Sequence, residues 1–269
     1  MAWTKSQTEF HQTFPPQSEY VARILELAAA EYEGTVTDIS ERTGIPTGKQ
    51  KGKVKPHIYY AKYMGLIDFS LQNGVYKLKL TDLGNVVYEN DPYMLESKTG
   101  LLCHYNICDT DSGAPQWAYV FKQSGAVLDK SESAQFVQSR IDEQYGFNVS
   151  LSVVKSAYTG GMFEELELLE WTDRIVHVKK DMHYSDMSVY AYSLLDMWER
   201  YMGDRTEIII DDITDGLKWN YVFGFDTDEA LRVLEELEEG GIVKLNKQLR
   251  PISVIKTAAR AELLGKLYD

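Results

Sequence analysis

Residues 54–80 have the sequence VKPHIYYAKYMGLIDFSLQNGVYKLKL, which predicts a helix followed by a β-hairpin. Gly65 ends the helical pattern, and two runs of strand-like composition follow at 66–71 and 75–80. Between the runs lies Asn73-Gly74, a dipeptide that favours the two-residue turn of a hairpin. The N-terminal region is therefore expected to combine helices with a small antiparallel sheet.

Two further helices are predicted before this stretch, over residues 18–33 and 37–42, and Gly34 is the expected stop of the first. A short helix over 81–88 closes the unit. Three helices followed by a hairpin is the order of a winged helix-turn-helix, so residues 1–90 are predicted to form such a domain. A small α+β domain without a nucleic-acid role is the alternative. The inward stripe of the third helix is expected to consist of Val54, Ile58 and Ala61.

A mostly helical middle domain is predicted over residues 91–203, beginning where Asp91-Pro92 breaks the chain. Its expected elements are helices over 131–145, 151–158 and 188–202 and a strand over 174–179. The apolar face of the first of these helices is predicted to consist of Phe136, Val137, Ile141 and Tyr145.

The last domain is predicted over residues 204–269 and repeats the order of the first. A strand-like run at 208–210 precedes a helix over 226–239, and Gly240-Gly241 stops that helix. A hairpin formed by 242–245 and 252–255 follows, which indicates a second winged-helix-like fold. The predicted fold class of the whole chain is therefore α+β and mostly helical.

Charge is distributed unevenly along the chain. The net charge is −13, yet the window from Arg42 to Ile67 contains no acidic residue. An island of opposite sign in an acidic protein indicates a surface for a polyanion, whereas the overall pI near 4.9 argues against a protein that coats nucleic acid nonspecifically. The positive residues of the window are Arg42, Lys49, Lys51, Lys53, Lys55 and Lys62.

The lysines of this island fall on a loop and on the helix that follows it. The loop, TGKQKGK at 47–53, contains Gly48 and Gly52, which let a backbone approach a ligand closely. It leads into the N-terminus of the third helix, where free amides favour an anion. It lacks the strand and the Ser/Thr of a nucleotide-binding P-loop, so a nucleoside triphosphate site is disfavoured. A solvated lysine-rich loop without a partner is the alternative.

On the third helix, Lys55, Tyr59 and Lys62 form one exposed row that Pro56 and Tyr63 are expected to flank. Lysines around a tyrosine suit a phosphate backbone with a ring packed on sugar or base. No arginine or asparagine lies on this face, so backbone binding with weak sequence preference is predicted. The predicted DNA-binding residues are Lys49, Gln50, Lys51, Lys53, Lys55, Tyr59 and Lys62.

The corresponding helix of the last domain has the opposite charge. Residues 226–239 carry seven acids against Arg232, and such a surface repels phosphate and favours a protein partner. The segment from Lys244 to Lys266 is basic again, with six positive residues against Glu262. From sequence alone, this tail cannot be assigned to the partner of the first island.

The sequence offers no recognisable catalytic or metal-binding motif. Cys103 and Cys108 are spaced unlike a zinc knuckle or a redox pair, so they are predicted to be buried thiols. No run of apolar residues is long enough for a membrane span, and the expected compartment is the cytoplasm. His11 and His104 are candidates for acid–base chemistry, although a hydrogen-bonded core histidine is the more common case. The candidate acid pairs, each expected to be a loop or cap position, are Asp109 with Asp111, Asp211 with Asp212, and Asp226 with Asp228.

Several segments in order along the chain resemble a bacterial family that includes SspB-like proteins of DNA phosphorothioate modification and defence operons. The segments are FHQTF (10–14), GLI (65–67), LTDLG (80–84), DPYMLESKTGLLCHY (91–105), PQWAYVF (115–121) and VYAYSLLDMWER (189–200), together with the C-terminal helix and hairpin. The resemblance extends from about Phe10 to the C-terminus. It implies a protein that binds double-stranded DNA and opens one strand for sulfur insertion.

The resemblance also implies partners and a cofactor. The partners are a cysteine desulfurase, a sulfurtransferase-like enzyme and an ATPase of the same operon, with no membrane involved. A metal-dependent nick would require Mg²⁺ held by carboxylates, and no such cluster is recognisable from the residues. The alternative is a non-catalytic winged-helix regulator or adaptor that recruits other operon proteins through its acidic C-terminal helix.

Overall fold

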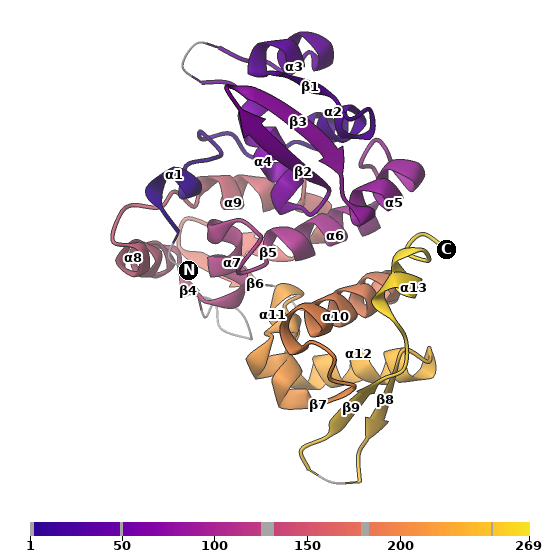
Figure 1. The fold of residues 1–269 in the computed structure, drawn as a ribbon. Coiled ribbons are helices and arrows are strands. Elements are labelled where there is room, and N and C mark those ends of the chain that lie inside the picture. The colour runs from indigo at the N-terminus through magenta and orange to yellow at the C-terminus, as the bar shows by residue number, and fades with distance from the viewer. Residues whose placement is uncertain (1–2, 49–50, 125–131, 179–182, 249) are drawn as a thin grey trace.

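A computed structural model describes residues 3–48, 51–124, 132–178, 183–248 and 250–269 of the chain. The predicted α+β class is confirmed, because helices predominate and the strands form three small antiparallel sheets. Figure 1 shows these sheets one after another along the molecule, with the N-terminal sheet at the top and the C-terminal sheet at the bottom. No helix within the described ranges is long and apolar enough to cross a bilayer.

The N-terminal region places its helices around a three-stranded sheet of order β1-β3-β2. The hairpin turn is confirmed: Asn73 and Gly74 both have positive φ angles, 51° and 81°, as a type I′ turn requires. The elements are α1 (Lys5–Thr8), α2 (Ser18–Ala29), β1 (Glu33–Thr35), α3 (Val36–Thr43), α4 (Val54–Tyr63), β2 (Ile67–Gln72), β3 (Val75–Leu80) and α5 (Asp82–Asn90).

The prediction of one helix over residues 18–33 was wrong at its C-terminal end. Helix α2 stops at Ala29, and the residues that follow turn back to pair with β3. Gly34, expected to stop the helix, lies inside β1 opposite Tyr76. A Cβ at position 34 would meet the Tyr32 ring at 2.7 Å, so glycine is needed there for close packing.

The middle region contains helices, as predicted, but also a small sheet of order β4-β6-β5. Its elements are α6 (Ser97–Ile107), α7 (Pro115–Lys122), β4 (Glu132–Ser133), α8 (Ala134–Tyr145), α9 (Ser152–Tyr158), the 3-10 turn η1 (Glu164–Leu166), β5 (Leu169–Trp171), β6 (Ile175–Val178) and the 3-10 turn η2 (Tyr184–Asp186). Val137 and Ile141 of α8 are fully buried as expected. Phe136 is 46% exposed, which corrects the predicted apolar face: its ring lies on the solvent side, beneath the guanidinium of Arg140.

The C-terminal region repeats the element order of the N-terminal region. In both, a long helix precedes a strand, helical segments, a hairpin and a short helix, and the sheet orders β1-β3-β2 and β7-β9-β8 correspond. The N-terminal region has two helical segments between its first strand and its hairpin, and the C-terminal region has three. The elements are α10 (Met187–Met202), β7 (Glu207–Ile209), the π-helical turn η3 (Asp212–Gly216), α11 (Trp219–Val222), α12 (Thr227–Glu239), β8 (Val243–Asn246), β9 (Ser253–Lys256) and α13 (Arg260–Leu264).

The regions share one continuous core. Tyr60 of α4 packs edge-to-face on Trp117 of α7, which joins the N-terminal helices to the middle region. The C-terminal tail returns to the same helices, because the hydroxyls of Thr99 and Tyr268 lie 2.5 Å apart and Ser188 donates a hydrogen bond to the carbonyl of Leu267. The described buried apolar residues therefore form a single cluster.

A buried polar network also links α6 to α10. The guanidinium of Arg200 lies 3.1 Å from an oxygen of Asp109 and 2.7 Å from an oxygen of Asp196. Tyr105 donates to Asp196 and accepts from Arg200, and Tyr201 donates to Asp109. Because Asp109 is only 1% exposed, its charge depends on these partners.

Candidate nucleic-acid interface

The basic island lies on α4 and on the loop before it, as the sequence predicted. Lys51 and Lys55 are exposed, and Lys53 and Lys62 are half-buried. Among the described residues, no carboxylate lies within ion-pairing distance of Lys51, Lys53 or Lys55. Lys49 and Gln50, also predicted to contact DNA, lie outside the described residues.

Lys53, Lys55 and Lys62 each lie over an aromatic ring. The ammonium of Lys55 lies 5.9 Å from the centre of the Tyr59 ring, and that of Lys62 lies 5.0 Å from the Phe69 ring. Lys53 turns towards α2, where its ammonium is 5.1 Å from the Tyr20 ring. Contacts of this kind orient a cation without neutralising it, so the positive charge stays available to a phosphate.

Lys62 differs from the other lysines because it faces an acid. Its ammonium lies 3.9 Å from an oxygen of Asp68 on β2, and both side chains are substantially exposed. Exposed pairs of this length contribute little, about 0–1 kcal/mol, so the pair lowers the local charge without holding Lys62 rigidly. Lys51, Lys53 and Lys55 therefore form the net-positive part of the surface.

Tyr59 is less available than the sequence suggested. Its ring is half-buried and packs against Phe69 at a centroid distance of 5.2 Å, against Tyr63 at 6.1 Å and against Phe10 at 6.2 Å. Only part of the ring faces solvent, which limits it to an edge contact with sugar or base.

Pro56 and Tyr63 were predicted to flank the exposed row, and this prediction was wrong, because both are buried. The segment before α2 covers that side of α4. The Phe10 ring packs edge-to-face on Tyr60 and Tyr63, each at 4.9 Å, and Trp3 adds a second contact to Tyr63. Helix α4 is consequently buried on two sides and exposes only a narrow strip.

The loop before α4 is held by its own hydrogen bonds. The amide of Gly52 donates to the side chain of Gln12, and the amide of Lys53 donates to the carbonyl of Pro46. A Cβ at position 52 would meet the Thr47 hydroxyl oxygen at 2.4 Å, so this glycine serves loop closure. Pro56 has no amide hydrogen to offer. An anion here would therefore rely more on lysine side chains than on the helix N-terminus.

A polar hollow of about 400 Å³ lies beside Lys51. His11 lines it and accepts a hydrogen bond from the amide of Thr13 through Nδ1, while its Nε2 is buried without a partner in the described structure. Burial lowers the pKa of His11 to about 4, so the ring is neutral at pH 7. Gln12 and Thr13 have positive φ angles, 49° and 77°, which strain the backbone at this point. The hollow extends the polar surface from α4 to Asn148 and Ser150.

The remaining candidates have structural roles. His104 is a hydrogen-bonded core residue, with Nδ1 2.5 Å from the Tyr158 hydroxyl and Nε2 2.7 Å from the carbonyl of Val222, and burial lowers its pKa to about 4. Cys103 and Cys108 are buried free thiols, as predicted. Within the described ranges, no group of three or more potential ligands is arranged to hold a metal ion.

Asp109, Asp111, Asp211 and Asp226 occupy loop or cap positions, as expected. Asp212 instead begins the π-helical turn η3, and Asp228 lies in the first turn of α12. One oxygen of Asp109 accepts hydrogen bonds from the amides of Asp111 and Ser112, which closes the turn after α6. Asp212 accepts from the amide of Ile209, and Asp226 caps α12 through the amide of Glu229.

Some acids and cations of the C-terminal region pair with one another. On α12, Glu235 pairs with Lys247, and Glu238 accepts a hydrogen bond from the amide of Leu245. Arg260 pairs with Glu199, and Lys256 lies over the Trp198 ring. Figure 1 places the β8–β9 hairpin at the opposite end of the molecule from α3 and the loop before α4. The basic tail therefore does not extend the surface of the first island.

Comparison with known proteins places the chain in a family. The model of DUF4007, a family described only as proteins of unknown function, matches residues 9–157. The chain belongs to the DUF4007 family. The match covers the N-terminal region, α4 with its lysines and most of the middle region, so the candidate interface lies within the family's shared part. No curated protein sequence matches the chain.

The fold is that of SspB. Two crystal structures of SspB, one with a bound magnesium ion, superpose with a TM-score of 0.73 at 16% sequence identity. Each alignment covers 97% of this chain and 86% of the SspB chain. The resemblance to SspB-like proteins, predicted from short segments, is thus confirmed by the family match and by the fold.

Proposed function

We propose that this protein is the DNA-binding component of a bacterial DNA phosphorothioation system. Two facts support the proposal: the chain has the fold of SspB, and the family match spans the basic surface. The proposed ligand is double-stranded DNA, bound through its phosphate backbone by Lys51, Lys53, Lys55 and Lys62 and by the edge of the Tyr59 ring, with Lys49 and Gln50 as further contacts.

In this proposal the N-terminal region acts as a winged helix. Helices α2, α3 and α4 correspond to its three helices, and the hairpin β2–β3 corresponds to its wing. The third helix of a helix-turn-helix is the one that enters the major groove, and here α4 carries Lys55 and Lys62. The C-terminal region, with the same order of elements, is a second winged-helix-like fold.

The observation that carries the proposal is the state of the lysines. Lys51, Lys53 and Lys55 have no carboxylate within ion-pairing distance in the described structure, although the chain has 41 acids against 28 lysines and arginines. A protein with this excess of acids could easily pair them. Unpaired cations on one strip are what counterion release on a DNA backbone requires.

The proposed binding is largely independent of DNA sequence. The exposed strip of α4 carries lysine and tyrosine but no arginine or asparagine, the side chains that make bidentate contacts with guanine and adenine. Competition between unrelated duplexes of equal length measures this. A protein that reads base sequence loses about 1–3 kcal/mol of binding free energy for each mismatched base pair of its site. Without such readout, the affinities for unrelated duplexes are expected to agree within about tenfold.

The function is tested by fluorescence anisotropy with a labelled DNA duplex at about 50 mM salt, where phosphate contacts are strongest. Binding that weakens steeply with added salt is expected. A correctly folded protein that fails to bind duplex DNA under these conditions would contradict the proposal and would indicate that the lysines dock an acidic protein.

An adaptor role is the second candidate, and the acidic surface of α12 favours it. Glu236 and Glu239 extend from this helix without a cation partner in the described structure, which suits a basic surface on another operon protein such as the cysteine desulfurase, the sulfurtransferase-like enzyme or the ATPase. Incubation of supercoiled plasmid with the protein and Mg²⁺ or Mn²⁺ distinguishes an adaptor from a DNA-binding component that also nicks one strand. Accumulation of open-circular DNA supports a nickase, and binding to intact plasmid supports an adaptor.

A further inference from the structure

The loop between α5 and α6 presents two large apolar side chains to solvent. Tyr93 is 72% exposed and Leu95 is 78% exposed. Single exposed apolar residues are ordinary on protein surfaces, but two in one short loop, each more exposed than any other large hydrophobic described in this chain, need an explanation.

This loop is built to hold that conformation. The carboxylate of Asp91, itself 5% exposed, accepts hydrogen bonds of 2.9 Å from the amides of Leu95 and Glu96. Between the two exposed residues, Met94 is buried and has a φ of 58°, a left-handed conformation that costs a methionine about 1–2 kcal/mol. Tyr93 and Leu95 are therefore held outward by a fixed backbone, which lowers the entropy lost when a partner covers them.

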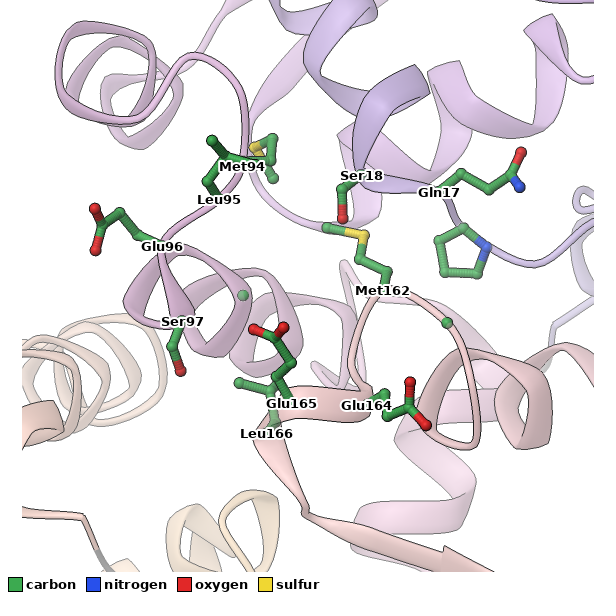
Figure 2. Close-up of a pocket in the computed structure, with 13 residues that line it drawn as sticks. Gln17, Ser18, Met94, Leu95, Glu96, Ser97, Met162, Glu164, Glu165 and Leu166 are labelled. Carbon is green, nitrogen blue, oxygen red and sulfur yellow. The ribbon is translucent and has the colours of Figure 1, made fainter.

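Leu95 borders a hollow of about 410 Å³ between the start of α6 and the turn η1. Its apolar walls come from Met94, Leu95, Met162 and Leu166. Figure 2 shows Leu95 and Glu96 on one side of the hollow, Met162 on the other, and Glu165 projecting between them. A hollow of this size has room for one or two side chains of a partner, and it lies towards the small end of the pockets that hold a whole small molecule, about 300–1,000 Å³.

The rim of the hollow is acidic. Glu96, Glu164 and Glu165 are exposed, and no cation of the described residues lies within ion-pairing distance of any of them. The nearest lysine on α6, Lys98, lies instead over the Tyr268 ring. A second, smaller hollow shares Ser97, Glu165 and Leu166 with the first and continues to Asp186, so the acidic lining extends along a groove.

We propose that this groove binds a basic peptide segment of a partner protein. An apolar anchor side chain of the segment enters the hollow between Leu95 and Met162, and Tyr93 covers it from outside. Flanking lysines or arginines of the segment meet Glu96 and Glu165. Charge complementarity selects this occupant, since an acidic peptide or a DNA phosphate would be repelled. The hollow borders the basic island, because Gln17 lines it and accepts a hydrogen bond of 3.1 Å from the Lys53 ammonium. The inference rests on Tyr93, Leu95 and the acidic rim, and it does not depend on DNA binding.

The probe for this site is a fluorescein-labelled synthetic peptide with a leucine between lysines and arginines, and anisotropy with the full-length chain measures its binding. The double variant Tyr93→Ser/Leu95→Ser should weaken binding at least tenfold, because central apolar anchors dominate such interfaces. Glu164→Lys/Glu165→Lys should weaken it by a similar factor at low salt. The matched control, Asp204→Lys/Glu207→Lys, makes the same change of net charge at two exposed acids outside the groove and outside α12, and it should alter binding less than about twofold.

Two outcomes would overturn the inference. Equal weakening by Asp204→Lys/Glu207→Lys would show that peptide binding follows the net charge rather than the groove. Unchanged binding by Tyr93→Ser/Leu95→Ser would exclude the apolar anchor. Sedimentation of the same variants tests whether a second copy of the chain occupies the groove. A wild-type dimer that becomes a monomer in Tyr93→Ser/Leu95→Ser would also contradict the proposal. A far-ultraviolet circular dichroism spectrum and a cooperative urea transition like those of the wild type serve as the fold control for each variant.

Discussion

The N-terminal and C-terminal regions share their order of elements and their sheet order but carry opposite surfaces. In the first, α4 and the loop before it carry Lys51, Lys53 and Lys55 without carboxylate partners in the described structure, and only Lys62 faces an acid, Asp68. In the second, α12 and its N-cap together carry seven acids, and Lys247 pairs with one of them, Glu235. Because the two regions share this order, their difference lies in the side chains of α4 and α12, and we expect those side chains to decide which partner each region binds.

The most direct test of this comparison reverses the charge of the basic island, so that it becomes negative as α12 is. The triple variant Lys51→Glu/Lys53→Glu/Lys55→Glu should lose duplex DNA binding by at least about a hundredfold, because each change removes a phosphate contact and adds a repulsion. Anisotropy titration at fixed salt measures the loss. The matched control reverses the exposed cations of the C-terminal region in the variant Lys244→Glu/Arg250→Glu/Lys266→Glu, which should bind almost as the wild type does. Equal losses would assign binding to net charge alone.

The second prediction concerns the network between α6 and α10. Arg200→Leu leaves the buried carboxylate of Asp109 without its cation, and we expect a loss of about 2–4 kcal/mol in the free energy of unfolding, somewhat discounted because Arg200 is partly exposed. Urea denaturation measures the loss. Arg232→Leu, on the outer face of α12, should change stability by less than about 0.5 kcal/mol. A loss no larger than that of the control would mean that the network contributes nothing to stability.

The third prediction uses the histidines, which the C-terminal region lacks. Burial lowers the pKa of His11, His57 and His104 to about 4, against an ordinary value of 6.5. The unfolded chain therefore binds these protons at a higher pH than the folded chain does, so stability present above pH 6.5 is lost as the pH falls towards 4. As the pH falls, hydrogen exchange, corrected for its intrinsic pH dependence, should show the amides of α4 and α6 losing protection at a higher pH than those of α12. Loss of protection at the same pH in all three helices would contradict this prediction.

The smallest expected effect lies in the hairpin turn. Gly74 has a φ of 81°, so Gly74→Ala should cost about 1 kcal/mol through backbone strain, although a Cβ there would touch nothing. Thermal unfolding measures it. Gly100→Ala on α6, where no positive φ is found and a Cβ would lie 3.5 Å from Leu166, should instead be neutral or slightly stabilising. If both changes have the same effect, the turn geometry is not the cause.

Periodic segments were predictable from sequence because their spacing encodes one buried face. The hairpin around Asn73-Gly74, helix α4 and the capped helix α12 all lie within a few residues of their predicted positions. The covering of α4 by Phe10 was not predictable, because FHQTF has no regular period and its partners Tyr60 and Tyr63 are distant in sequence.

The candidate site was likewise predictable in part. The absence of acids between Arg42 and Ile67 predicted a positive surface on α4 and on the loop before it, because local charge can be counted along the chain. The structure places the lysines there. The hollow beside His11 and the network around Arg200 were missed, because each joins segments that only the folded chain brings together.

The salt dependence of DNA binding tests the central claim most directly. Each lost phosphate contact lowers the slope of log affinity against log salt by about 0.9, so Lys51→Ala/Lys53→Ala/Lys55→Ala should reduce the slope by about 2–3. The control Lys244→Ala/Arg250→Ala/Lys266→Ala should leave it unchanged. A slope equal to that of the wild type in the folded α4 variant would contradict the account, because the lysines of the basic island would then make no contact with the DNA backbone.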